Sequence, residues 1–139
     1  MKIKFICFGT EIDNLRMTFD YNIIGIPKRH QFNKNDRLYL AIKAGGKWFV
    51  CGRAQAGQET DLNPFNNPGR YYTYLISNVE ACVPFSINQK SRELLGDYWA
   101  LMFQTPRYVE NDKYIEFLNK EFKKIDNEKM FEILLEEFI

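Results

Sequence analysis

A run of alternating residues that ends at a pair of glycines constrains the fold of this chain more than any other feature. Within residues 36–43, every second position is aliphatic, namely Leu38, Leu40 and Ile42. This period of two is typical of a strand with one buried face. Gly45-Gly46 follows, and glycine readily adopts the positive φ angles of a tight hairpin turn. Strand character resumes over residues 48–56, so the sequence predicts an antiparallel hairpin.

The segments beside this hairpin predict more strands and two loops. Residues 2–9 and 70–85 have strand character, the second with a bulge or turn at Ser77-Asn78. Residues 10–21 have ambiguous spacing, and we expect a loop with at most one helical turn. Residues 57–69 contain two prolines, which disrupt a regular ladder, so a long irregular loop is expected there.

The last third of the chain predicts helices. Residues 87–95 form a short helix that stops at Gly96, and a second helix capped by Asn111 or Asp112 carries the apolar stripe Ile115, Leu118, Phe122 and Ile125. A final amphipathic helix covers residues 127–139. The sequence therefore predicts an α+β fold: a curled sheet or small barrel of five or six mostly antiparallel strands with C-terminal helices. Residues 1–126 form the domain, and the last helix packs on it or serves association.

The charges are unevenly placed along the chain. The net charge is only +1, which excludes binding of nucleic acid by bulk charge alone. One basic segment nevertheless has a single carboxylate, Asp36, among its cations Lys28, Arg29, Lys34, Arg37, Lys43, Lys47 and Arg53. The final helix is acidic. A local basic patch therefore remains open as a binding surface.

Residue types needed for catalysis are scarce. His30 is the single histidine, the three cysteines contain no Cys-x-x-Cys pair, and no nucleophile or phosphate-loop motif occurs. We therefore expect no enzyme, no metal and no cofactor. Buried free thiols indicate a reducing compartment, and the absence of an apolar run of roughly 18 residues argues against a membrane. The expected location is the cytoplasm.

Residue types suited to binding nucleic acid are more frequent in this sequence than those needed for catalysis. Lys28, Arg29 and Lys34 have the charge to hold phosphate oxygens, although a solvated turn is the alternative. The chain is 16% aromatic, and exposed rings stack on bases, each stack contributing roughly 1–3 kcal/mol. The candidate rings, for each of which core packing is the alternative, are Trp48, Phe65, Tyr71, Tyr72, Tyr98 and Trp99.

Three short motifs resemble the EVE domain, a member of the PUA-like group that includes the YTH and ASCH domains. They are Gly25-Ile-Pro-Lys-Arg-His30, Asn35-Asp-Arg-Leu-Tyr-Leu40 and Gly46-Lys-Trp-Phe-Val-Cys-Gly-Arg-Ala54. The resemblance implies a small curled sheet or barrel that reads a modified base of DNA or RNA flipped into an aromatic pocket. It also implies that this chain is the DNA-recognition part of a modification-dependent restriction system.

By position, Pro27, Lys28, Arg29 and Trp48 match the family's segment most directly. Together with the reasoning from charge and aromatic residues, the expected nucleic-acid contacts are Pro27, Lys28, Arg29, His30, Lys34 and Arg53. The expected base pocket draws on Tyr21, Trp48, Phe65, Tyr72 and Trp99. Two positions depart from the family pattern: Ile24 stands where a tryptophan is frequent, and Asn35 where glycine is usual. The pocket wall must then come from another ring, such as Tyr21, Tyr72 or Trp99.

Two other functions compete with a base reader. The acidic, amphipathic segment 127–139 is typical of a helix that docks a protein partner, a second copy of the chain or the rest of a larger protein. A small nuclease or RNA-processing enzyme is the third hypothesis.

Overall fold

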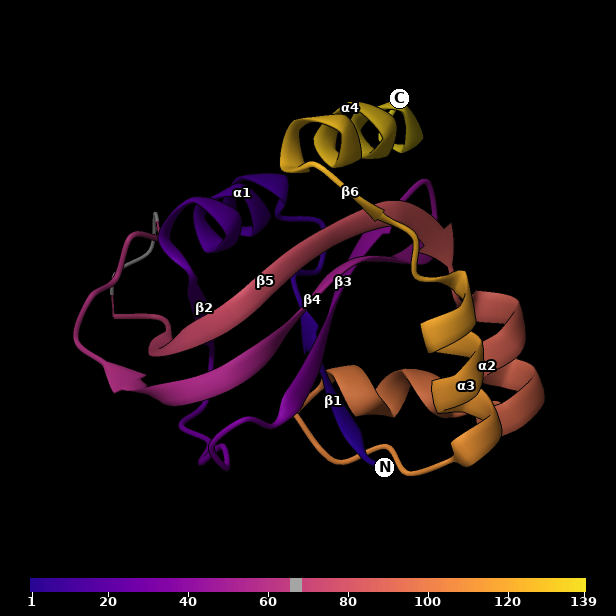
Figure 1. Ribbon diagram of the computed structural model, residues 1–139, viewed down its shortest axis with the longest axis horizontal. Helices are drawn as coiled ribbons and strands as arrows, with labels where there is room; N and C mark the ends of the chain where they lie inside the picture. The colour runs from indigo at the N-terminus through magenta and orange to yellow at the C-terminus, as the bar shows by residue number, and fades with distance from the viewer. Residues whose placement is uncertain (66–68) are drawn as a thin grey trace.

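A curled six-stranded sheet forms the centre of the molecule (Figure 1). The computed structural model describes residues 1–65 and 69–139. The strands are β1 (Ile3–Cys7), β2 (Ile23–Ile26), β3 (Arg37–Ala44), β4 (Lys47–Thr60), β5 (Tyr72–Ser86) and β6 (Lys124–Ile125). Their order is β1-β3-β4-β5-β2, and β6 pairs with β5 off this path. β1 is parallel to β3, and the other pairings are antiparallel.

Helices cover both faces of this sheet. They are α1 (Ile12–Tyr21), α2 (Asn88–Leu95), the 3-10 helix η1 (Trp99–Phe103), α3 (Asp112–Glu121) and α4 (Asn127–Glu137). The predicted α+β class, with a mostly antiparallel sheet and C-terminal helices, is confirmed. Among the described residues the sheet is open, because β1 and β2 at its two ends do not pair with each other.

Two hydrophobic cores lie on the two faces. One contains Leu38, Leu40 and Ile42 of β3 together with side chains of α1 and α4. The other contains side chains of η1 and α3, with Ile87 just before α2. In Figure 1, α1 and α4 accordingly lie on one side of the strands, and α2, η1 and α3 on the other. Residues 127–137 therefore complete a core rather than extend away from the domain.

The predicted hairpin is present, but its first strand is buried on both faces. The structure pairs β3 with β4 across the turn at Gly45 and Gly46, which have φ angles of 55° and 78°. The expectation of a half-buried strand is wrong, because Tyr39 and Ala41 enter the second core. The helices that bury these residues follow much later in the chain, so the local pattern did not reveal them.

Two other segments differ from the sequence predictions, and a third lies mostly outside the described residues. Residues 12–21 form a full helix, because Leu15, Thr18 and Phe19 bury one face of it against the sheet. β4 continues to Thr60 across a bulge, so the irregular segment starts later than predicted. The turn predicted at residues 66–69 lies mostly outside the described residues.

Further along, β5 runs unbroken through a bulge beside Asn78, which has a φ angle of 51°. The bulge is thus the alternative that the structure adopts there. Asn111 caps the start of α3, as predicted, because its side chain accepts a hydrogen bond from the backbone amide of Tyr114. The helix ends at Glu121, earlier than predicted. Ile125, predicted as the last residue of its apolar stripe, lies in β6 and pairs with Ala81.

Candidate nucleic-acid interface

The basic turn between β2 and β3 borders a cleft of about 320 Å³, which we call the turn cleft. It is lined by residues 29–33, residues 57–59 and Tyr74. The backbone amide of His30 donates to the Tyr74 hydroxyl at 2.9 Å. The ring of Phe32 lies edge-to-face against both His30 and Tyr74, with centroid separations of 4.8 and 5.0 Å. These contacts hold the turn against β5.

A buried lysine anchors the same turn. Lys4 of β1 is 3% exposed, and its Nζ lies 3.0 Å from His30 Nε2 and 3.4 Å from Asp36 Oδ2. The Tyr108 hydroxyl donates to the two Asp36 carboxylate oxygens at 2.8 and 3.0 Å, and the backbone amide of Asn33 donates to Asp36 Oδ2 at 2.9 Å. We call these five residues the ionic network. It connects β1, the basic turn and the start of β3.

Burial and the ionic network together favour the neutral form of His30. Lysine offers only donors, so the His30 Nε2 accepts and the ring proton is on Nδ1. Burial, and then the nearby Lys4 charge, lowers the pKa of His30 below its usual 6.5, while Asp36 opposes this shift. The imidazole is therefore neutral at pH 7, and it can contact a ligand as a neutral aromatic ring.

Three exposed cations lie in or next to the basic turn, and one of them, Arg29, lines the turn cleft. Lys28, Arg29 and Lys34 all extend into solvent. The Arg29 guanidinium is 3.3 Å from Glu59 and lies 5.0 Å from the centroid of the Tyr72 ring. An exposed ion pair of this kind contributes only about 0–1 kcal/mol, so Arg29 can exchange it for a phosphate at little cost.

Pro27 and Lys28 also border a second, much smaller crevice. It has a volume of about 30 Å³ and includes Phe103, Thr105 and Pro106. This is near the size of a single water molecule, so a base does not fit there. Of the two spaces that border the basic turn, only the turn cleft is therefore large enough for a base.

The structure does not bring the five predicted pocket rings together. Trp48 and Trp99 both contact Phe103, at centroid separations of 4.4 and 5.8 Å, and Trp99 is 7% exposed. These two belong to the second core. Phe65 is buried against Tyr71, 5.6 Å away.

The remaining two predicted rings are exposed. Tyr21 is the last residue of α1 and is 58% exposed, and Tyr72, below Arg29, is 41% exposed. Of the five, only Tyr72 contacts a residue that lines the turn cleft. The rings that do line this cleft, His30, Phe32 and Tyr74, include two that the sequence reasoning missed as pocket residues.

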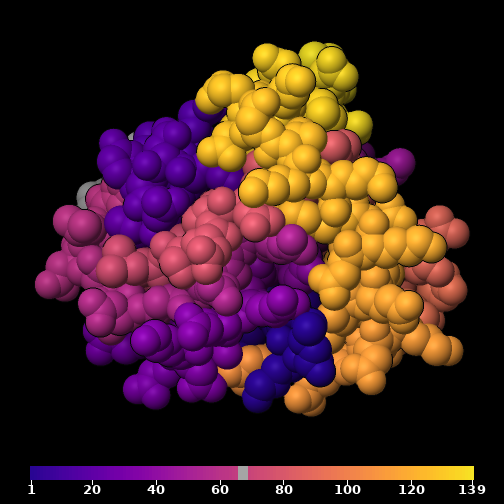
Figure 2. Space-filling view, in the orientation of Figure 1, coloured from indigo at the N-terminus to yellow at the C-terminus, as the bar shows by residue number. Residues whose placement is uncertain are grey.

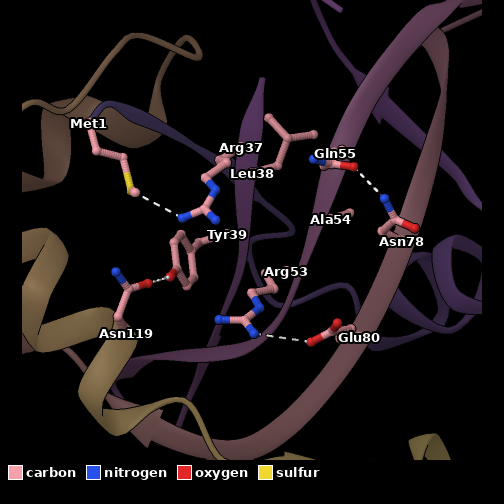
Figure 3. Close-up of a pocket in the computed structure, with 10 residues that line it drawn as sticks. All are labelled: Met1, Arg37, Leu38, Tyr39, Arg53, Ala54, Gln55, Asn78, Glu80 and Asn119. Atoms are coloured by element: carbon pink, nitrogen blue, oxygen red, sulfur yellow. Dashed lines mark hydrogen bonds and ion pairs between the residues drawn. The ribbon is translucent and has the colours of Figure 1, made fainter. Parts of the chain in front are cut away.

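Arg53 lies in a different cleft (Figure 3). This space of about 560 Å³ is bounded by β3, β4, β5 and α3. We call it the arginine cleft after Arg37 and Arg53, its two cationic residues. Arg53 is 3.2 Å from Glu80, and its guanidinium lies 3.9 Å from the Phe122 ring centroid. The sequence grouped Arg53 with the basic turn, but the fold places it with the residues of this second cleft.

The three thiols are unsuited to chemistry. All are free, and Cys51 and Cys82 are buried. Burial raises the pKa of Cys82 to about 12, which the nearby Arg53 charge offsets in part, and it raises the pKa of Cys51 well above its usual range. Because the thiolate is the reactive form, these side chains act as small apolar core residues.

Searches against known proteins give no further assignment. No protein-family model matches this chain, and no curated protein matches its sequence. In residues 1–65 and 69–139, no three histidine, cysteine or acidic side chains gather closely enough to hold a metal ion. None of the helices in this described part combines the length and apolarity that a membrane crossing needs.

Proposed function

We propose that this chain is a nucleic-acid-binding module that receives a modified, extruded base in the turn cleft and has no catalytic chemistry of its own. The observation that carries the proposal is this 320 Å³ cleft, which exposed Arg29 lines and whose lining segment 29–33 is flanked in sequence by the exposed cations Lys28 and Lys34. Its volume is at the lower end of the roughly 300–1,000 Å³ typical of ligand pockets. The motif resemblance to the EVE domain points in the same direction.

The two kinds of side chain have separate roles in this proposal. The cations hold phosphate oxygens and position the strand without reading its sequence. The partly exposed rings of His30 and Phe32 offer apolar contact to a base. Amide and carboxyl groups of Asn33, Gln58 and Glu59 are available for the hydrogen bonds that read a base edge. A flipped base is recognised by stacking on rings and by hydrogen bonds to its edge, so the pocket needs both kinds of group.

A binding screen tests the proposal. Fluorescence anisotropy compares DNA and RNA oligonucleotides that carry modified bases with their unmodified twins, at two salt concentrations. We expect one modification to bind most tightly and the affinity to fall as salt rises. Equal binding of every modified oligonucleotide and its twin would contradict the proposal.

Variants separate the two roles. Lys28→Gln with Arg29→Gln should weaken binding to all oligonucleotides and reduce the salt dependence. Phe32→Leu should reduce the preference for the modified base and leave the salt dependence unchanged. Lys90→Gln, on α2, is the matched control, because Lys90 pairs with Glu93 of its own helix and does not line the turn cleft.

The proposed location is the cytoplasm, with a modification-dependent restriction system as the proposed setting. All three thiols are unpaired, which agrees with a reducing compartment. Incubation of labelled nucleic acid with divalent metal tests the competing hypothesis of a nuclease, which requires cleavage.

A protein-docking role for α4 is the second candidate. Its outer face exposes Ile133 and Leu135, at 37% and 46%, beside the acidic residues Glu132 and Glu136. Deleting the helix is not a clean test, because its inner face is part of a core. The substitution Leu135→Lys should instead abolish self-association or partner capture without unfolding the domain. A light-scattering mass equal to that of the monomer would exclude self-association.

A further inference from the structure

The arginine cleft has features of a binding site that are independent of the turn cleft. Cross-strand pairing places Arg37 opposite Gln55 and Tyr39 opposite Arg53. These four side chains therefore share one face of the β3–β4 ladder, since alternate residues of a strand point the same way. Figure 2 shows this side of the molecule, with the purple strands set back between β5 and the orange α3.

Internal hydrogen bonds occupy the side-chain amide oxygens of Asn119 and Gln55 in this cleft. The Tyr39 hydroxyl donates to Asn119 Oδ1 at 2.5 Å, so the Asn119 amide nitrogen remains available. Gln55 Oε1 accepts from Asn78, and its amide nitrogen points toward Arg37 in Figure 3. Gln55 thus presents its N–H group toward Arg37, whereas the Asn119 nitrogen points away from both arginines in Figure 3.

The two guanidinium groups differ in how they are held. Arg53 is fixed between Glu80 and the Phe122 ring, which preorganises it. Arg37 is exposed, and its Nη1 contacts the thioether of Met1 at 3.0 Å. Thioether sulfur is a weak acceptor, and no carboxylate pairs with Arg37 among the described residues. Glu80 is the single carboxylate of the described lining residues, so the two arginines leave one positive charge in excess.

From this arrangement we infer that the arginine cleft binds a phosphate group between Arg37 and Arg53. Phosphate oxygens accept several hydrogen bonds at once, and the planar guanidinium fork matches them in a bidentate way. The amide nitrogen of Gln55 supplies a further donor. The cleft of about 560 Å³ is larger than one phosphate requires, so the group arrives on a larger molecule, either a free mononucleotide or a nucleic-acid strand.

Calorimetric titration at low ionic strength tests this site with three probes: inorganic phosphate, a nucleoside monophosphate and an unmodified single-stranded oligonucleotide. Wild-type protein should bind phosphate. Arg37→Gln should weaken this binding at least about tenfold, because it removes charge-assisted hydrogen bonds to the phosphate oxygens. Arg92→Gln, at an exposed position of α2 outside the cleft, should leave it unchanged.

A variant that binds phosphate more tightly than wild type excludes misfolding as the explanation for the changed affinity. Glu80→Gln removes the carboxylate that competes for Arg53, so it should strengthen phosphate binding. If wild-type protein does not bind phosphate, or if Arg37→Gln leaves its affinity unchanged, the inference is overturned.

The probes also identify the source of the phosphate. Competition by the oligonucleotide supports a nucleic-acid strand, and binding of the mononucleotide without such competition supports a free nucleotide. The variant Arg29→Gln distinguishes this site from the turn cleft, because it should weaken modified-oligonucleotide binding and leave phosphate binding intact. The two proposals can therefore fail separately. If the wild-type protein does not bind phosphate but still prefers the modified oligonucleotide, only the phosphate-site proposal is overturned.

Discussion

Replacing Lys4 with methionine should destabilise the domain substantially, because it removes the only cation that contacts the Asp36 carboxylate among the described residues. The side chains of Lys4 and Asp36 are 4% and 9% exposed. Methionine keeps most of the length and apolar stem of lysine, so the substitution mainly deletes charge. The neighbouring His30 loses a donor at 3.0 Å in the same step.

The magnitude follows from what Asp36 retains. Breaking a buried pair by removing one partner typically costs about 3–5 kcal/mol, because it leaves an uncompensated charge. Asp36 keeps the hydrogen bonds from the Tyr108 hydroxyl and the Asn33 amide, which stabilise the carboxylate. We therefore expect a loss near the lower end of the range, about 3 kcal/mol of unfolding free energy.

Urea denaturation at pH 7.5 measures this loss, and a double-mutant cycle assigns it. Asp36→Asn keeps the oxygen that accepts from the Tyr108 hydroxyl but removes the charge. The double variant Lys4→Met with Asp36→Asn should recover more than about 1 kcal/mol relative to the sum of the single losses. A loss of under about 1 kcal/mol for Lys4→Met, or additive single losses, would refute the charge argument.

Three further predictions concern stability. The lowered His30 pKa means that the unfolded chain binds the proton more readily, so the stability of the fold should decrease as the pH drops below 6.5. In urea titrations from pH 7.5 to 5, His30→Gln should lose less stability than wild type. An equal loss of stability in the two proteins would contradict this prediction. Gly52→Ala should cost about 1–3 kcal/mol, because its Cβ would lie 2.7 Å from the Glu80 carbonyl oxygen and 2.8 Å from the Phe19 ring. Phe131→Ala should lower the unfolding free energy by about 3–5 kcal/mol, and the substitution of exposed Leu135 by alanine should lower it by at most about 0.5 kcal/mol. Thermal and chemical unfolding measure both losses. Similar losses for the two variants would mean that α4 does not complete the core.

The local hairpin was predictable because its signal is local. The alternation of Leu38, Leu40 and Ile42 and the Gly45-Gly46 turn depend on neighbours within a few residues. The cap of α3 at Asn111 was predictable for the same reason. The helix at residues 12–21 was missed, because its spacing is ambiguous until the sheet that Phe19 packs against is known.

The candidate site divides in a similar way. Lys28, Arg29 and Lys34 could be identified from the basic composition of one turn, and the structure leaves all three exposed. The rings could not be assigned, because stacking residues and core residues have the same composition. Trp99 packs on Phe103, whereas Phe32, which no motif singled out, lines the turn cleft.

By itself, the sequence determined the α+β class, the hairpin and the concentration of positive charge around it, since propensity, alternation and charge are properties of short segments. Only the tertiary structure decided which charges are buried and which are free. Lys4 and Asp36 are 32 positions apart (36 − 4) and meet because β1 pairs in parallel with β3. Arg53 joins Arg37 in a cleft because antiparallel register places both on one face. Such long-range juxtapositions depend on strand order and packing, which no local pattern specifies.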